Sequence, residues 1–115
     1  MRTIIAGGRT VTEYQLVLDA IEASGWASEI RQIVSGTAKG VDSLGERWAN
    51  ENGVEIAPFP PDWDTHGRAA GPIRNRTMAE NADRLIAIWD GVSTGTKSMI
   101  GLAEKNGLEV FVHRI

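Results

Sequence analysis

Short apolar runs recur along the chain and alternate with longer segments whose apolar residues have helical spacing. The runs have the length of strands buried in a parallel sheet. The alternation predicts an α/β fold, a Rossmann-like open, mostly parallel sheet of about five strands with helices on both faces. The predicted strands are Thr3–Ala6, Ile30–Val34, Val54–Pro58, Leu85–Trp89 and Glu109–His113.

Helical periodicity fills most of the intervals between these strands. Thr10-x-x-Glu13 has the pattern of a capping box, which predicts a helix start at this point. Pro72 suits the first position of a later helix, because its missing N–H would have no helical partner there. The predicted helices are Thr10–Ser24, a second that carries Leu44 and Trp48 and ends near Asn52, Pro72–Ala82, and a last one that ends at Lys105.

The longest segment without a clear period is Pro60–Gly71. Loops of this length in a compact protein are often functional. Trp63 in this loop could stack on a base, but a partly buried loop anchor is the more common role of a tryptophan.

The stretch Val34–Asp42 reads as a strand, a glycine-containing turn and the first turn of a helix. Free backbone N–H groups at a helix start favour an anion. Gly36 would let the chain turn sharply and let a ligand approach, and Gly40, placed within the helix, would allow close helix–strand packing. The stretch lacks a complete dinucleotide fingerprint or P-loop. A glycine-rich turn that binds nothing is the alternative.

Several polar loops follow the predicted strands and would meet at one edge of a parallel sheet. Ligands of such folds bind beyond the carboxyl ends of the strands, where the strand order reverses. The loops concerned are Gly7–Arg9, Ser35–Asp42, Phe59–Arg76 and Trp89–Lys97. The candidate ligand-binding residues are Gly8, Arg9, Ser35, Gly36, Thr37, Ala38, Lys39, Asp42, Arg74, Asn75, Asp90, Gly91, Ser93, Gly95 and Thr96.

Individual candidates have alternative roles. Asp42, in the first turn of a predicted helix, would repel a phosphate, so a contact to a ribose hydroxyl or a helix-stabilising role is expected. Ser93 and Thr96 could bind a phosphate, although turn and cap roles explain such residues equally well. Arg76 lies two residues from Arg74 and faces another side of the helix, where a solvated salt bridge is the simpler role.

Composition narrows the classes of function. The 115 residues are 42% hydrophobic and 23% charged, which is typical of a single soluble domain. The chain has no cysteine, which excludes disulfides, thiolate metal sites and a cysteine nucleophile. His66 and His113 are too isolated to predict a metal site. The first residues lack a signal-peptide pattern and no apolar run is of membrane-spanning length, so we expect a cytoplasmic protein.

The net charge is -3, whereas domains that bind nucleic acid through its backbone are usually basic. Basic residues nevertheless gather in the loops that follow strands. This distribution predicts a local anion site in an acidic protein. The residues are Arg9, Lys39, Arg68, Arg74, Arg76 and Lys97.

Two segments carry a resemblance to known families. Ser-Gly-Thr-Ala-Lys-Gly-Val-Asp, at Ser35–Asp42, resembles the Ser-Gly-x-Ala-x-Gly-Ile-Asp signature of DprA/Smf proteins. Arg74–Ala79 resembles the Arg-Lys-x-x-Met-Ala segment of LOG proteins, the cytokinin-activating phosphoribohydrolases, and Gly91 with Gly95–Thr96 is similar to their Pro-Gly-Gly-x-Gly-Thr-x-x-Glu motif. Together with the Gly-Gly-Arg start, these segments identify the chain as a member of the SLOG superfamily, in its small cpYpsA-related (YspA-like) group.

The resemblance covers nearly the whole chain and implies a Rossmann-like sheet with a pocket for nucleotides or nucleotide-derived ligands. The family is widespread in bacteria and their phages, and some relatives sense nucleotide signals. The chain departs from LOG proteins at one decisive position. Counting from Gly95–Thr96, the LOG catalytic glutamate corresponds to Met99. This departure argues against LOG-type cleavage of the N-glycosidic bond, unless Asp62, Asp64 or Asp90 supplies the carboxylate.

The sequence therefore predicts a sensor or binding protein for a nucleotide or nucleotide derivative, with no cofactor or metal. One alternative is a LOG-like nucleotide hydrolase. A second is DprA-like binding of single-stranded DNA, which would need a basic groove with stacking aromatics. A third is a partner-binding module with a vestigial pocket. A homo-oligomer is compatible with all of these functions.

Overall fold

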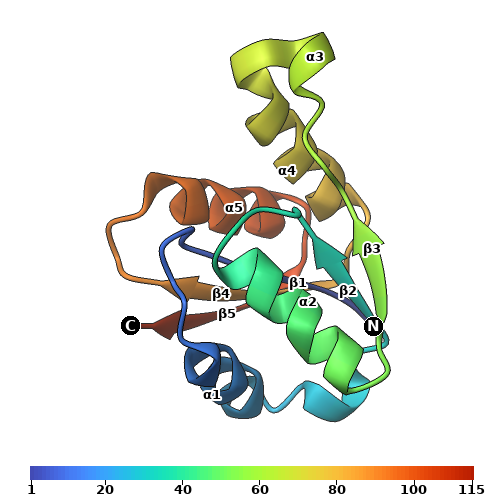
Figure 1. Cartoon of the computed structure of the whole chain (residues 1–115), viewed down its shortest axis with the longest axis vertical. Coiled ribbons are helices and arrows are strands. Elements are labelled where there is room, and N and C mark those ends of the chain that lie inside the picture. The colour runs from blue at the N-terminus through green and yellow to red at the C-terminus, as the bar shows by residue number, and fades with distance from the viewer.

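The computed structural model describes residues 1–115 and contains one five-stranded sheet in the order β3-β2-β1-β4-β5 (Figure 1). Every neighbouring pair of strands is parallel. The predicted Rossmann-like α/β fold is therefore confirmed, and the sheet is wholly rather than mostly parallel. The strands are β1 (Arg2–Gly7), β2 (Gln32–Ser35), β3 (Glu55–Pro58), β4 (Arg84–Trp89) and β5 (Glu109–Arg114).

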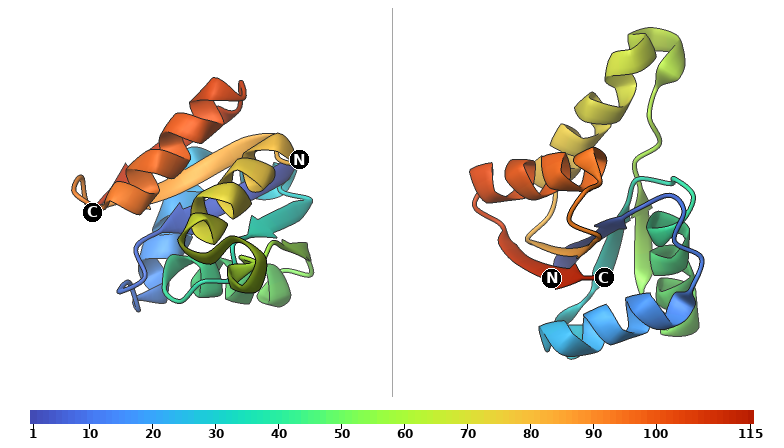
Figure 2. Two further views of the ribbon diagram at one scale, coloured as in Figure 1. Left: turned by 90° about the horizontal axis from the view of Figure 1, so that it is seen from above. Right: turned by 90° about the vertical axis from the view of Figure 1, so that its left-hand side faces the viewer.

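Two pairs of helices cover the two faces of the sheet (Figures 1 and 2). On one face, α1 (Tyr14–Ser24) and α2 (Val41–Glu51) pack on a core that contains Ile5. On the other face, α4 (Ala70–Glu80) and α5 (Thr94–Lys105) pack on a second core that contains Ile4. Adjacent residues of a strand point to opposite faces, which explains why the buried strands are continuously apolar. No helix is both long and apolar enough to cross a membrane.

The order of the strands creates the reversal point at which such sheets bind ligands. From β1 the chain moves outward to β2 and β3, and it then returns to the opposite side of β1 to form β4. The connections that leave β1 and β4 consequently diverge to opposite faces of the sheet. The space beyond the carboxyl ends of these two strands is left open between the connections.

The segment that changes face projects from the body as an arm, residues 62–73 (Figures 1 and 2). It contains the short helices α3 (Trp63–His66) and η2 (Gly67–Ala69), so the predicted structureless loop is wrong in detail. These helices are too short to produce a recognisable period. The Trp63 side chain is 52% exposed, contrary to the expected partly buried anchor.

Two predicted helix starts are also wrong. Helix α1 begins at Tyr14, and its N-cap residue Glu13 makes no side-chain capping bond, so the Thr10 capping box does not form. Helix α4 begins at Ala70, because η2 leads directly into it, and Pro72 is therefore its third residue. A proline is still tolerated there, since its N–H would lie within the unbonded first turn.

Candidate functional site

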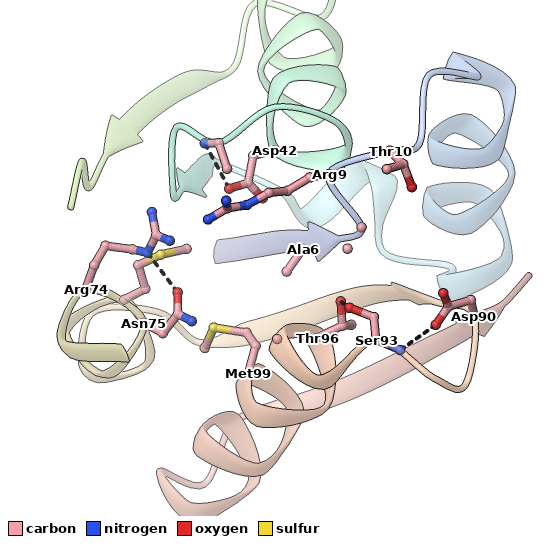
Figure 3. A pocket seen from close by; sticks show the side chains of 15 residues that line it. Ala6, Arg9, Thr10, Asp42, Arg74, Asn75, Asp90, Ser93, Thr96 and Met99 are labelled. Carbon is pink, nitrogen blue, oxygen red and sulfur yellow. Dashed lines mark hydrogen bonds between the residues drawn. The ribbon is translucent and has the colours of Figure 1, made fainter. Parts of the chain in front are cut away.

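A cavity of about 450 Å³ lies beyond the carboxyl ends of β1 and β4, at the reversal point of the sheet (Figure 3). Its walls come from the loop after β1, the start of α2, helix α4, and the loop and first turns of α5. It is lined by Ala6, Gly7, Gly8, Arg9, Thr10, Ala38, Asp42, Arg74, Asn75, Met78, Asp90, Ser93, Gly95, Thr96 and Met99.

Most of the candidate residues predicted from the sequence line this cavity, but one group does not. Ser35 is the last residue of β2, Gly36, Thr37 and Lys39 belong to the loop that follows it, and Gly91 lies against the guanidinium of Arg114. The motifs that contain these residues indicate the right loops, but they do not show which side chains point into the cavity.

Other lining residues were not singled out as candidates. Thr10 was assigned to a cap, and Met78 and Met99 resemble ordinary core residues in sequence. Met99 could have been identified from the sequence, because it stands at the position of the LOG catalytic glutamate. Gly7 belongs to the predicted loop Gly7–Arg9, whereas Ala6 is the last residue of the predicted strand Thr3–Ala6.

The loop between β2 and α2, residues 36–40, is joined to the loop after β1. The N–H of Val41 donates to the carbonyl of Gly8 at 3.2 Å. Gly40 precedes α2 with φ of 78°, and a Cβ there would lie 2.3 Å from the Gly8 carbonyl oxygen. The expected position of Gly40 inside the helix is therefore wrong. Glycine is required because two backbone segments touch.

Side chains of the protein already accept hydrogen bonds from two of the backbone N–H groups that the sequence predicts to be free for an anion. The N–H of Thr37 donates to Ser35 Oγ at 3.1 Å, and the Ser35 hydroxyl donates to Glu46 at 2.5 Å. The N–H of Ala38 donates to Asp42 Oδ2 at 3.2 Å. These bonds hold Thr37 in a left-handed conformation with φ of 62°, which is unusual for a β-branched residue. The expectation that both N–H groups are free to bind an anion is therefore wrong.

Arg74 connects α4 to this loop. Its Nη1 donates to the carbonyl of Gly36, and its Nε donates to Asn75 Oδ1 at 2.8 Å. Burial lowers the pKa of Arg74, while the nearby charge of Asp42 opposes that change. Arg74 lies in the second turn of α4, not the first as predicted. A guanidinium carries five N–H donors, so donors remain for a ligand.

Asp42 presents a partly buried carboxylate to the same wall (Figure 3). Burial is the main cause that raises its pKa to about 6, and Glu46 raises it further. The Ala38 N–H and the charges of Arg74 and Arg9 act in the opposite direction. None of the ion pairs within 4.0 Å involves Asp42.

The opposite wall is the start of α5, with Ser93 as its N-cap residue. Asp90 Oδ1 accepts the N–H groups of Val92 and Ser93 at 2.8 and 2.7 Å, and these bonds lower the pKa of Asp90. The hydroxyls of Ser93 and Thr96 lie 3.4 Å apart. This wall therefore offers hydroxyl groups, the positive end of a helix dipole, and an ionised carboxylate at its edge.

The floor between the walls combines apolar and amide groups. Met78 and Met99 line it beside Asn75, and no aromatic side chain contributes. Because Arg74 donates to Asn75 Oδ1, the amide NH₂ of Asn75 is the group left free. Asp62 and Asp64 lie on the arm and do not line the cavity, so Asp42 and Asp90 are its carboxylates.

Comparison with known proteins gives three consistent results. A profile of the YspA, cpYpsA-related SLOG family matches residues 1–66. The Gene 61 protein of Mycobacterium phage D29 is 32% identical over 121 residues, which cover 95% of this chain and 93% of that protein. The fold is similar to DNA processing protein A (DprA) from Streptococcus pneumoniae, with a TM-score of 0.75 and 20% identity. The similarity covers 96% of this chain but only 49% of the DprA chain, so the chain spans about half the length of DprA.

The contact at Gly40 can be tested against a matched glycine. Gly67 has nearly the same backbone conformation, φ 56° and ψ −131° against φ 78° and ψ −129° at Gly40, but a Cβ there would meet nothing within 4 Å. We expect Gly67→Ala to lower the free energy of unfolding by roughly 1–3 kcal/mol, the cost of a side chain in a conformation that is almost exclusive to glycine. Gly40→Ala should cost roughly 1–3 kcal/mol more, because two backbone segments must separate. Urea denaturation of both variants measures the difference, and equal losses would contradict the proposed constraint.

Proposed function

The chain belongs to the YspA, cpYpsA-related SLOG family, and we propose that it binds a nucleotide or nucleotide-derived ligand in the described cavity, as a sensor or binding protein. The observation that carries this proposal is the polar cavity at the reversal point, which Arg9 and Arg74 line on one side and Ser93 and Thr96 on the other (Figure 3). Its volume lies within the usual range of small-molecule sites, roughly 300–1,000 Å³.

The chemistry of the cavity suits the parts of a nucleotide. Arg9 and Arg74 supply two cations for a phosphate, and Arg74 can bind phosphate oxygens with its planar group. The N-terminus of α5 provides a second place that favours negative charge. Met78 and Met99 can contact the face of a base, since thioethers pack favourably on aromatic rings.

A nucleotide panel tests the proposal. We expect at least one mononucleotide or nucleotide-derived signalling molecule to raise the melting temperature, because a ligand that binds only the folded state stabilises it. A fluorescent single-stranded oligonucleotide should bind weakly. Tight, salt-dependent binding of the oligonucleotide without any response to nucleotides would contradict the proposal.

That opposite outcome would favour DNA binding as the function. The name and fold of DprA, together with the exposed Trp63 on the arm, are the observations that support it. Against it, the net charge is -3 and no aromatic side chain lines the cavity. Binding of single strands generally combines a basic groove with stacked aromatics.

Hydrolysis of a nucleotide is the second alternative, supported by the two carboxylates that line the cavity. We expect little release of free base from AMP or modified nucleoside monophosphates. Met99, at the position of the LOG glutamate, is 3% exposed and cannot move a proton. Loss of such a group costs roughly 10²–10⁴ in rate. Chromatographic detection of free base is the measurement. Robust release that disappears in Asp42→Asn or Asp90→Asn would show that another carboxylate performs the step.

Arg74 provides a direct test of the anion site. We expect Arg74→Ala to weaken binding of the best nucleotide from the panel by roughly 1.5–3 kcal/mol, the range for a charge-assisted hydrogen bond. Without ligand it should also lower the free energy of unfolding by about 1–2 kcal/mol, because the Gly36 carbonyl and Asn75 lose a donor. Calorimetric titration and urea denaturation measure the two effects.

Arg76 is the matched control for this experiment. It is exposed on the same helix and does not line the cavity. Arg76→Ala removes the same charge and should leave stability within about 0.5 kcal/mol and affinity nearly unchanged. Equal losses of affinity in both variants would indicate a general charge effect instead of a contact made by Arg74.

A further inference from the structure

Asp42 is a cavity carboxylate with few partners for its chemistry. An ionised carboxylate can accept about four hydrogen bonds. Asp42 Oδ2 accepts one, the 3.2 Å bond from Ala38, and no hydrogen bond reaches Oδ1. No lysine or arginine forms an ion pair with it within 4.0 Å. A partly buried carboxylate in this state favours a ligand that brings a hydrogen-bond donor.

The surroundings of Asp42 limit what kind of donor can approach. Arg9 on the loop after β1 and Arg74 on α4 place positive charge beside it, which disfavours a cationic ligand group. Its own helix contributes the carboxylate of Glu46, and the preceding loop contributes the Ala38 N–H. A phosphate placed directly on Asp42 would be repelled. A neutral donor fits best, and in a nucleotide the sugar hydroxyls are strong neutral donors.

We propose that Asp42 accepts a hydrogen bond from the ribose diol of the ligand and so selects ribonucleotides over their deoxy counterparts. This inference rests on the proposed nucleotide-binding function and adds the part of the ligand that Asp42 recognises. The Ala38 N–H orients the carboxylate, because it holds Oδ2 and leaves Oδ1 for the cavity. The phosphate then lies away from Asp42, toward the outer face of Arg9 and Arg74 or the start of α5.

A hydrogen bond from ribose to Asp42 predicts the sign of a pH effect. A hydroxyl donates best to the ionised carboxylate, and the pKa of Asp42 is about 6. The preference for ribose should therefore be complete above pH 7 and should decline as the pH falls through 6. If an anion instead sat beside Asp42, protonation would relieve its repulsion equally for the ribose and deoxyribose forms, and the ratio of their affinities would not fall with the pH. A fall in this ratio therefore distinguishes the two arrangements.

The experiment compares ribonucleotides with matched deoxynucleotides by calorimetric titration. The probes are AMP, GMP, CMP and UMP together with their 2′-deoxy and 3′-deoxy forms, at pH 7.5 and pH 5. Each set carries the same 5′-phosphate, so the ratio of affinities cancels titration of the phosphate itself. At pH 7.5 we expect removal of at least one hydroxyl to weaken binding roughly 10- to 100-fold, as for a hydrogen bond to a charged group. At pH 5 this ratio should shrink toward one.

Variants separate Asp42 from the other carboxylates. Asp42→Asn keeps an oxygen that can accept the Ala38 N–H, so it should fold with a nearly unchanged melting temperature and lose the preference for ribose. Asp64→Asn, on the arm outside the cavity, is the matched control and should keep the preference. If the preference is lost in Asp90→Asn and retained in Asp42→Asn, the assignment to Asp42 is overturned.

Failure of the proposed role of Asp42 and failure of nucleotide binding as a whole would give different results. Equal binding of ribo- and deoxynucleotides by the wild-type protein overturns the role of Asp42 and leaves nucleotide binding intact. A ratio that does not fall at pH 5 also overturns it, and this measurement does not depend on the folding of a variant. Absence of binding by these nucleotides and by every member of the nucleotide panel overturns the proposed function, and the role of Asp42 with it.

Discussion

The cavity depends on one close approach between two pieces of backbone. Gly40 packs against the backbone of Gly8 and Arg9, and the adjacent N–H of Val41 donates to the Gly8 carbonyl. This contact fixes the first turn of α2, and therefore Asp42, relative to the loop that carries Arg9. The two loops that follow β1 and β2 thus form a single wall. Any side chain larger than hydrogen at position 40 would separate them.

The polar groups of the wall hold the protein together as well as lining the cavity. Arg74 binds the Gly36 carbonyl and Asn75, while Asp42 and Ser35 accept N–H groups of the loop. These bonds orient the groups that would contact a ligand before it arrives, which reduces the entropy lost on binding. They also couple affinity to stability, because a ligand that draws Arg74 outward must compete with the Gly36 carbonyl. The opposite wall behaves differently, since Asp90 uses one oxygen to hold the start of α5 and remains exposed.

The strands, their parallel arrangement and the edge that carries the cavity could be predicted from sequence, because buried parallel strands and strand-end loops leave a strong local pattern. The rest depended on contacts between distant residues. The sequence predicts Gly40 inside a helix, because residue identity does not reveal its contact with Gly8. Thr10 and Glu13 satisfy a capping rule, yet the helix begins after Glu13. The apolar pattern does not predict that Met78 and Met99 line the cavity, because a cavity floor and a core have the same pattern. The Thr37 N–H already donates to Ser35 Oγ, and Glu46 on α2 orients the Ser35 hydroxyl by accepting its hydrogen bond. The sequence shows neither contact.

The arm divides the residues that line the cavity into two consecutive parts of the chain. Residues 1–66, which match the family profile, supply Arg9, Ala38 and Asp42, and the remainder supplies Arg74 and the start of α5. The two portions join along the β1–β4 ladder, to which the arm contributes no residue. The cavity is thus a seam between two consecutive parts of one chain, and Arg74 of the second part reaches across it to the Gly36 carbonyl of the first. Substitutions at the start of α5 can reshape that wall while the wall of Asp42 and the ladder stay in place, whereas a substitution of Arg74 changes both parts at once.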